Sequence, residues 1–280
     1  MPEGDTIYRT ARTLHRALAG KQVTQFQTVL PKLARADEDS GIVGRTIEYV
    51  EAQGKWLLIY FSGDLILLTH MLMSGSWHIY RPGETWKRRM IHMRIVIGTE
   101  TMIAVAFNVP VAEFHSAQSL RRRTGFSQLG PSVLATEFEP ARILANLRAN
   151  PEKEIGAALL EQSLLAGVGN VFKSEVCFGS GVNPFRRIDS LSIAELSSIV
   201  TTARKFMTEN IAESAPEHTV NLDSLRRTMG NWGTEERLWV YGRHGRPCRR
   251  CGAAIETRRQ QPGARVTFWC PECQPFQPAA

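Results

Sequence analysis

The first five residues of the chain, Met1-Pro2-Glu3-Gly4-Asp5, combine a proline with two carboxylates. Initiator methionine is usually removed before a small residue, so we expect Pro2 to become an N-terminal secondary amine. An α-amino group titrates near neutrality, and its attack on an aldehyde carbon gives a charged iminium that needs no added cofactor. Alternatively, Pro2 is only a chain end, and Glu3 and Asp5 are charges at a helix start. These five residues leave both interpretations open.

Four of the five cysteines form two Cys-x2-Cys pairs, Cys248/Cys251 and Cys270/Cys273, which are separated by eighteen residues. This spacing is typical of a tetrahedral zinc site in a reducing cytosol. Four thiolates close the coordination sphere of zinc, so we predict one structural Zn²⁺ and no catalytic metal. The remaining cysteine, Cys177, is expected to be a buried apolar residue.

Four further positions have both a structural and a functional interpretation. Lys55 follows Gly54 at the start of a predicted strand, where a lysine either protects a sheet edge or lowers the pKa of a nearby amine and holds a phosphate. Met73 belongs either to the core or to a loop that wedges into a DNA stack. Asn170 opens a helix after Gly167-Val168-Gly169, which is either a plain turn or an anion site. Arg265 follows a hairpin turn and is either solvated or a phosphate contact.

The formal charge of +7 favours a polyanionic partner. From Ser224 onward the chain has ten arginines, four glutamates and no lysine or aspartate, so most of the excess lies near the cysteines. We expect no signal peptide, because Glu3 and Asp5 stand where a basic region would be, and no membrane span, because the most apolar run, Leu65–Met73, is too short. The predicted location is therefore the cytoplasm.

The elements that must position these residues fall into two halves. Residues 5–19 predict a helix capped by Asp5, and several short strand-like runs follow it, which suggests a β-sandwich or barrel. Those runs are 23–29, 41–52, 56–61, 65–70, 77–80, 92–97 and 102–107. After a linker the sequence predicts helices over 140–149, 154–165, 170–179 and 190–213, then a hairpin over 261–269. We expect residues 214–235 to form a mobile loop.

Four pieces of the sequence occur together in one order: Pro2-Glu3-Gly4, Gly54-Lys55, the motif Gly167–Glu175, and Tyr241-Gly242-Arg243 leading into the cysteine pairs with Arg265. Together they resemble the formamidopyrimidine-DNA glycosylase and endonuclease VIII family of base-excision repair enzymes, over nearly the whole chain. The resemblance implies an α+β fold with an N-terminal β-sandwich, a helix–two-turn–helix domain and a C-terminal zinc finger. We expect the boundaries 1–125, a linker at 126–137, then 138–235 and 236–280.

The same resemblance implies a bifunctional DNA glycosylase and AP lyase that acts on damaged DNA as a monomer. It makes Pro2 the nucleophile and Glu3 the general acid/base, and it gives Lys55 and Arg265 catalytic importance. Met73, Asn170, Lys173 and Arg265 are expected to contact DNA. The alternatives are a non-catalytic zinc-finger DNA-binding protein and, less well matched to the arginine-rich end, a proline-dependent tautomerase.

Within the family, Pro2-Glu3-Gly4 and Leu160-Glu161-Gln162 look like the endonuclease VIII branch, which favours oxidised pyrimidines. The purine-directed branch usually has an arginine in its later sandwich strands, and the region 107–110 lacks it. There are two departures from the family pattern. Thr6 stands where many members have a glutamate, and Gly156 stands where the purine branch has a phosphate-binding lysine.

Overall fold

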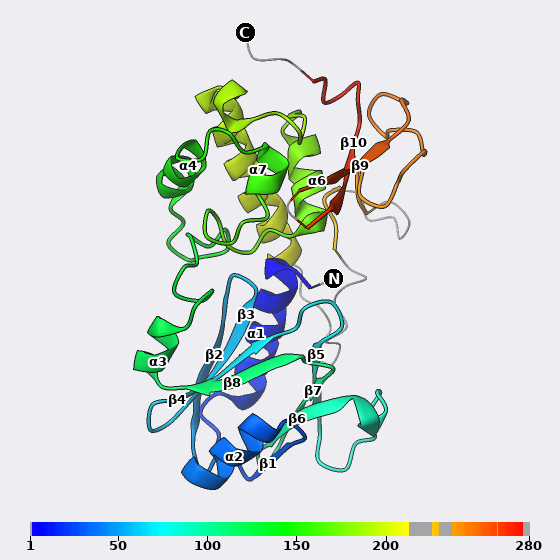
Figure 1. Ribbon diagram of the computed structural model, residues 1–280. Coiled ribbons are helices and arrows are strands. Elements are labelled where there is room, and N and C mark those ends of the chain that lie inside the picture. The colour runs from blue at the N-terminus through cyan, green and yellow to red at the C-terminus, as the bar shows by residue number, and fades with distance from the viewer. Residues whose placement is uncertain (1, 213–225, 230–236, 262, 277–280) are drawn as a thin grey trace. The chain divides into compact units, whose positions relative to one another are not determined.

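The computed structural model describes residues 2–212, 226–229, 237–261 and 263–276 (Figure 1). They form two compact units: unit 1 contains the described residues up to Ser127, and unit 2 contains those from Gln128 onward. Among the described residues, no helix has the length and apolar character needed to cross a membrane. Most of the predicted mobile loop, 214–235, lies outside the described residues.

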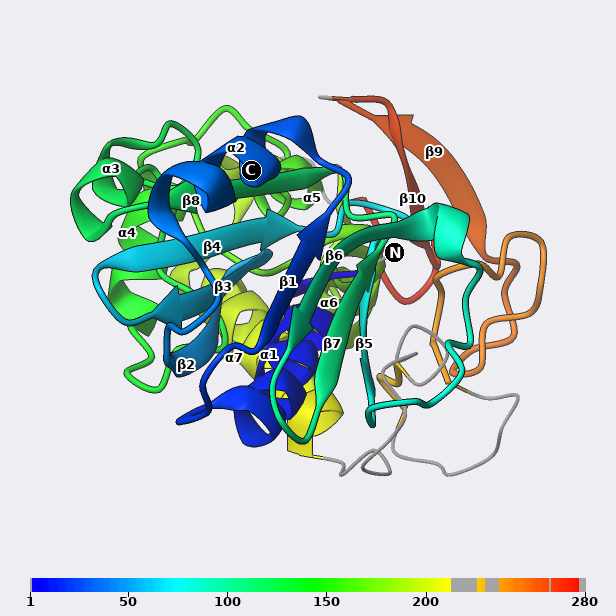
Figure 2. The ribbon, with the colours of Figure 1, turned by 90° about the horizontal axis from the view of Figure 1, so that it is seen from below.

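Unit 1 contains two antiparallel four-stranded sheets, which confirms the predicted sandwich. One sheet has the order β1 (Gln25–Thr28), β6 (Met93–Gly98), β7 (Ile103–Phe107) and β5 (Ser76–Tyr80), visible side by side in Figure 2. The other has the order β2 (Ile47–Gln53), β3 (Trp56–Phe61), β4 (Leu65–His70) and β8 (Val111–His115). Their core includes Leu57, Trp77 and Ile97, each fully buried.

Three helices accompany the sheets of unit 1: α1 (Gly4–Leu18), α2 (Pro31–Ser40) and α3 (Ala117–Arg122). Helix α1 buries Ile7, Leu14 and Leu18 in the sandwich core, as its periodicity predicts. The predicted cap is wrong, because the N-cap residue is Glu3 and Asp5 lies inside the first turn. Helix α2 was not predicted, since it is mostly polar and buries a single residue.

Unit 2 contains α4 (Pro140–Arg148), α5 (Ile155–Ala158), α6 (Asn170–Gly179), α7 (Ile193–Ala212) and the hairpin of β9 (Glu256–Gln260) and β10 (Arg265–Trp269). The range predicted for α6 is confirmed, but a single helix over 154–165 is wrong. After α5 the chain forms turns, because the side-chain amide of Gln162 bonds the carbonyls of Leu160 and Val168 and the Gly167 N–H. These bonds replace the helical ones.

Candidate functional site

Two contacts fix the direction in which α1 crosses the sandwich. The backbone N–H of Val50 donates to His15 Nδ1 at 3.1 Å, and the N–H of Gly20 donates to the Ile47 carbonyl at 2.7 Å. The earlier residue of the helix segment, His15, thus contacts the later residue of the strand, Val50, so α1 and β2 are antiparallel. The start of α1 consequently lies at the end of unit 1 where β2 turns into β3, which is the turn that contains Lys55.

The start of α1 is built from buried polar residues. Pro2 and Glu3 are both buried, and the backbone carbonyl of Glu3 accepts the Ile7 N–H at 3.0 Å. The Asp5 carboxylate accepts the Thr6 hydroxyl at 3.3 Å and lies 3.7 Å from the buried Arg9 guanidinium. Because partial positive charge gathers at a helix N-terminus, this end favours the carboxylates of Glu3 and Asp5. Thr6, one of the two departures from the family pattern, thus supports a neighbouring carboxylate.

Lys55 and His70 lie near one another at this end of the sandwich. Gly54 has φ of 59°, which allows the tight turn into β3, and the next residue, Trp56, pairs with His70 at the end of β4. Burial, followed by the charges of Lys55 and Arg123, lowers the pKa of His70 to about 4. The His70 ring is therefore neutral at pH 7, and the sequence alone did not indicate its nearness to Lys55.

The loop after His70 carries Met73 on the surface of unit 1. Met71 is buried and anchors the loop, whereas Met73 is 67% exposed. The loop turns through Leu72, a non-glycine residue with φ of 46°, whose N–H donates to His70 Nδ1 at 3.0 Å. A strained backbone that presents an apolar side chain to solvent fits a wedge better than a core residue.

A second loop reaches the same end of unit 1. Residue Phe107 pairs with Ser76, and Val111 pairs with His70, so the segment between them crosses from one sheet to the other beside the Met73 loop. Within this segment Asn108 has φ of 50°. The segment ends at Val111, the first residue of β8, where pairing with β4 holds it. Strand β8 was not predicted from the sequence.

In unit 2, the start of α6 and the strand β10 lie side by side. The Asn170 side chain donates to the Val266 carbonyl at 3.0 Å, and Ser174 Oγ accepts the Phe268 N–H at 3.3 Å. Helix and strand therefore run in the same direction, and Arg265, one residue before Val266, lies beyond the N-terminus of α6. The Arg265 side chain is exposed. An exposed guanidinium beside a helix N-terminus is suited to an anion.

The structure places Lys173 away from solvent, which does not fit the expected DNA contact. Its side chain is fully buried, and Nζ donates to Thr267 Oγ1 at 2.6 Å. A fully buried ammonium is rare in proteins unless it is bonded to other groups. Because no part of the Lys173 side chain reaches solvent, we assign it no direct contact with DNA.

Steric crowding in unit 2 explains why position 156 is a glycine. A Cβ atom built there would lie 2.6 Å from Gln260 Oε1 and 2.9 Å from the Pro184 carbonyl oxygen. The backbone N–H of Gly156 donates to that carbonyl at 2.9 Å, which holds the segment in place. A lysine therefore cannot stand here without displacing Gln260.

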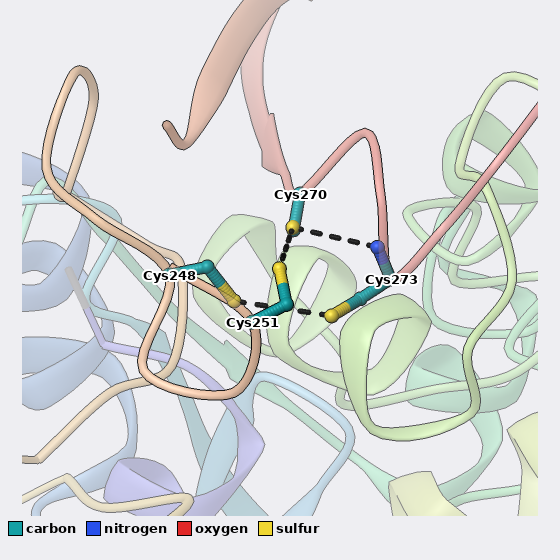
Figure 3. A group of neighbouring side chains, drawn as sticks. All are labelled: Cys248, Cys251, Cys270 and Cys273. Carbon is teal, nitrogen blue, oxygen red and sulfur yellow. Dashed lines mark hydrogen bonds between the residues drawn. The ribbon is translucent and has the colours of Figure 1, made fainter. Parts of the chain in front are cut away.

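The four paired cysteines converge on one point in unit 2, and their side chains face one another (Figure 3). Their sulfur atoms all lie within 4.8 Å, with Cys248 and Cys273 at 3.9 Å and Cys251 and Cys270 at 3.4 Å. A tetrahedral site with Zn–S bonds of about 2.3 Å separates its sulfurs by roughly 3.8 Å. The cluster therefore fits zinc. Cys177 lies apart from it and is fully buried, as predicted, and burial raises its pKa to about 12.

One buried carboxylate, Glu175, joins α6 to the chain that leads into the cysteine pairs. Its two oxygens accept the backbone N–H groups of Trp239, Val240 and Tyr241 at 2.8–2.9 Å, together with the Thr228 hydroxyl. Burial raises the pKa of this carboxyl, and the four donors oppose that effect. Glu175 ends the motif Gly167–Glu175, but the sequence alone did not indicate this role.

Models of known families match three stretches of the chain. The formamidopyrimidine-DNA glycosylase N-terminal domain matches residues 1–110, and the H2TH domain of the same family matches residues 129–221. A zinc finger found in FPG and IleRS matches residues 245–275. The chain belongs to the formamidopyrimidine-DNA glycosylase family. This is a family of DNA glycosylase and AP lyase enzymes.

Relatives in both branches of the family align along the whole chain. A Streptomyces coelicolor protein named probable endonuclease 8 2 is 39% identical, with 98% of this chain and 94% of the relative covered. The DNA-(apurinic or apyrimidinic site) lyase Nei2 of Mycolicibacterium smegmatis is 36% identical, with 98% and 99% covered. A formamidopyrimidine-DNA glycosylase of Exiguobacterium is 31% identical, with 98% and 99% covered.

Solved structures of this family have the same fold. A complex of Lactococcus lactis Fpg with DNA that contains an abasic site matches with a TM-score of 0.80 at 22% identity. That match covers 98% of this chain and 100% of the other chain. A complex of MutM with DNA that contains carbocyclic 8-oxo-G matches with a TM-score of 0.80 at 21% identity.

Proposed function

We propose that this protein is a bifunctional DNA glycosylase and AP lyase that removes oxidised bases through its N-terminal proline. The observation that carries the proposal is the position of Pro2 and Glu3 in unit 1. Both are buried at the start of α1, whose direction is fixed by His15 and Gly20, at the end that also holds Lys55 and Met73. A nucleophile, a carboxyl group, a cation and an apolar wedge thereby share one end of the sandwich.

The chemistry begins once Met1, which lies outside the described residues, has been removed. The Pro2 nitrogen attacks C1′ of a nucleotide that has been flipped out of the duplex, and Glu3 protonates the sugar ring oxygen, so that the C1′–O4′ bond breaks and the ring opens. The base then leaves C1′ with the proton that the Pro2 nitrogen gives up, and an iminium forms. The resulting iminium acidifies the hydrogens on C2′. Loss of one of them expels the 3′ phosphate, and a second elimination expels the 5′ phosphate, so the strand is nicked.

Lys55 supports the amine in this mechanism. An ammonium at the same end of the sandwich lowers the pKa of the Pro2 amine, because two like charges in one site repel each other. More of the amine is then in its neutral, nucleophilic form at pH 7. Lys55 also offers a charge-assisted hydrogen bond to a phosphate of the damaged strand.

Unit 2 supplies phosphate contacts through the N-terminus of α6, Asn170 and Arg265. The Cys248, Cys251, Cys270 and Cys273 thiolates hold one Zn²⁺, which closes the finger and has no part in the reaction. The metal thus keeps the β9–β10 hairpin, and with it Arg265, in a fixed conformation. We propose that damaged duplex DNA binds to this surface of a monomer.

Oxidised pyrimidines are the proposed main substrates. The support is the pair of relatives named endonuclease 8 2 and Nei2, at 39% and 36% identity, beside 31% for a relative named formamidopyrimidine-DNA glycosylase. The segment 107–110 also lacks the arginine of the purine-directed branch. Excision of 5-hydroxyuracil should therefore be faster than excision of 8-oxoguanine from matched duplexes.

Borohydride trapping on an oligonucleotide with an abasic site tests the mechanism. The protein must first be shown by mass spectrometry to begin at Pro2. Borohydride reduces an iminium to a stable amine, so we expect a covalent protein–DNA adduct whose peptide map places the link at residue 2. Protein with an acetylated N-terminus is the matched control and should give no adduct.

A missing adduct together with tight binding to the same DNA would reject the catalytic proposal. The chain would then be a DNA-binding protein that has kept the architecture without the chemistry. An adduct that maps to a lysine instead would keep the enzyme class and reject Pro2 as the nucleophile.

A further inference from the structure

One face of α6 contacts three consecutive residues of β10. Asn170 bonds the Val266 carbonyl, Lys173 bonds the Thr267 hydroxyl at 2.6 Å, and Ser174 accepts the Phe268 N–H. The spacing of three and four residues places all three α6 side chains on the same side of the helix. This face therefore sets the register of β10 against α6.

The middle contact continues into a chain of directed hydrogen bonds. The Thr267 hydroxyl accepts from Lys173 and donates its own proton to Gln260 Oε1 at 3.0 Å. The Gln260 amide group then donates to the Pro184 carbonyl at 2.9 Å and to Glu154 at 2.7 Å. Lys173 and Thr267 are fully buried and Gln260 is 4% exposed, so water does not compete for these bonds.

Two residues in this chain of hydrogen bonds, Gln260 and Thr267, are neighbours of Arg265. Gln260 is the cross-strand partner of Arg265 in the β9–β10 hairpin. Thr267 follows Arg265 by two residues, so the two side chains point to the same face of the strand. Holding Thr267 and Gln260 together therefore fixes the backbone on two sides of Arg265, while the arginine itself stays exposed.

We propose that Lys173 is a positioning residue that acts through Thr267 and Gln260 to hold Arg265 beside the N-terminus of α6. This inference rests on the proposed phosphate contact of Arg265. An ammonium is a stronger hydrogen-bond donor than a neutral group, which suits it to fix a hydroxyl in one orientation. Lys173 increases affinity for DNA without touching it.

A double-mutant cycle between residues 173 and 265 separates positioning from direct contact. The full-length zinc protein is titrated with a duplex that carries an abasic-site analogue, over a range of salt concentrations. Arg265→Ala should weaken binding about tenfold or more and reduce the salt slope by about one, as expected for one lost phosphate contact. Lys173→Met alone should weaken binding about 3- to 10-fold, because a lost hydrogen bond frees the arginine to move.

The decisive variant is the combination of both substitutions. If Lys173 acts through Arg265, Lys173→Met in the Arg265→Ala background causes no further loss of affinity and no further change in the salt slope. If Lys173 binds phosphate itself, the two losses add and the slope falls by about two in the double variant. The second result would overturn the proposal.

Thr267 offers a matched pair that leaves the lysine in place, which matters if Lys173→Met does not fold. Thr267→Val keeps the shape and removes the hydroxyl, whereas Thr267→Ser keeps the hydroxyl. Zinc content should equal that of the wild type in both. We expect Thr267→Val to weaken binding about 3- to 10-fold and Thr267→Ser to restore it. If Thr267→Val binds DNA with wild-type affinity while Arg265→Ala binds more weakly, the positioning role of Lys173 is rejected and the phosphate contact of Arg265 is retained.

Failure of the underlying phosphate contact gives a different result. Wild-type affinity and salt slope in Arg265→Ala would reject the proposed role of that arginine in binding. The amide hydrogen exchange of Val266, Thr267 and Phe268 then decides the remaining question. Faster exchange in Thr267→Val than in Thr267→Ser would retain Lys173 as the anchor of β10, and equal exchange would reject that too.

Discussion

Two helices of this protein begin with opposite electrostatics. The first turn of α1 holds Asp5 behind the N-cap residue Glu3, and both carboxylates are buried. The first turn of α6 follows Gly169 and has no acidic residue. The exposed Arg265 lies beyond the N-terminus of this helix. Neither N-cap residue makes a side-chain capping bond.

The comparison shows how one backbone feature serves two purposes. At α1 the partial positive charge of the helix end stabilises the protein's own carboxylates, one of which is the proposed acid. At α6 the same partial charge faces the proposed phosphate site, where glycine would let an anion approach the backbone. The proposed division is covalent chemistry at the first helix start and phosphate binding at the second.

Removing the acid at the first helix start should have the largest effect. Glu3→Gln keeps the size of the side chain but cannot deliver a proton, and general acid catalysis contributes about 10²- to 10⁴-fold to a rate. We expect base release in single-turnover assays to fall by that amount while binding to the damaged duplex is retained.

A preformed abasic site provides the control for this variant, because its base is already gone. Glu3→Gln should still give a borohydride adduct with such DNA. Unchanged base excision would remove Glu3 from the mechanism and with it the chemical role of the α1 start.

Removal of the zinc should affect only the second helix start. A strong chelator removes the metal bonds that hold the four cysteine sulfurs within 4.8 Å of one another, so we expect the finger to unfold. Affinity for DNA should fall at least tenfold, whereas the amide hydrogen exchange of the unit 1 core strands β3 and β7 should not change. Tight binding after verified zinc loss would make the finger dispensable.

An acidic residue at the start of α6 would give this helix a negatively charged first turn like that of α1. Asn170→Asp and Asn170→Ala both lose the donation to the Val266 carbonyl, so they form a matched pair. We expect the aspartate variant to bind DNA about tenfold more weakly than the alanine variant, because a fixed carboxylate repels phosphate. Fluorescence anisotropy at low salt measures the difference. Equal affinities would mean that no phosphate approaches this helix end.

Acid should weaken unit 1 through two histidines, the half-buried His70 and the buried His78, and this effect should be smaller. Burial lowers the pKa of His70 and of His78 to about 4, with nearby cations adding to it. The unfolded chain, with a histidine pKa near 6.5, then binds more protons than the folded one, so stability is full above pH 6.5 and is lost as pH falls toward 4. At pH 4 we expect each histidine to have lowered the free energy of unfolding by ~1–3 kcal/mol relative to neutral pH.

A non-titrating substitution isolates this contribution. His78→Gln keeps a polar group near Ser76 and Tyr80, which bond the ring in the wild type. Its thermal stability should fall less between pH 6.5 and 5 than that of the wild type. The same pH slope in both proteins would show that His78 is not the group that titrates.

The sequence predicted best where the pattern is local. Alternation and turn residues gave the ranges of β3 and β4 around Ser62-Gly63-Asp64, and periodicity gave the range of α6. The predictions failed where side chains decide the backbone. Gln162 replaces a predicted helix with turns, and β8 exists because β4 pairs with it, although its five residues are all only half-buried.

For the candidate site, spacing alone predicted the four paired cysteines as a zinc site. Residue types singled out Pro2, Glu3, Lys55, Asn170 and Arg265 but left two interpretations of each open, and only the family resemblance chose between them. Only the tertiary structure decided how they are held. It put Lys173 inside unit 2, brought Gln260 into the space beside Gly156, and placed His70 near Lys55. The physical reason is that burial and hydrogen-bond partners depend on segments far apart in the chain, which no local pattern encodes.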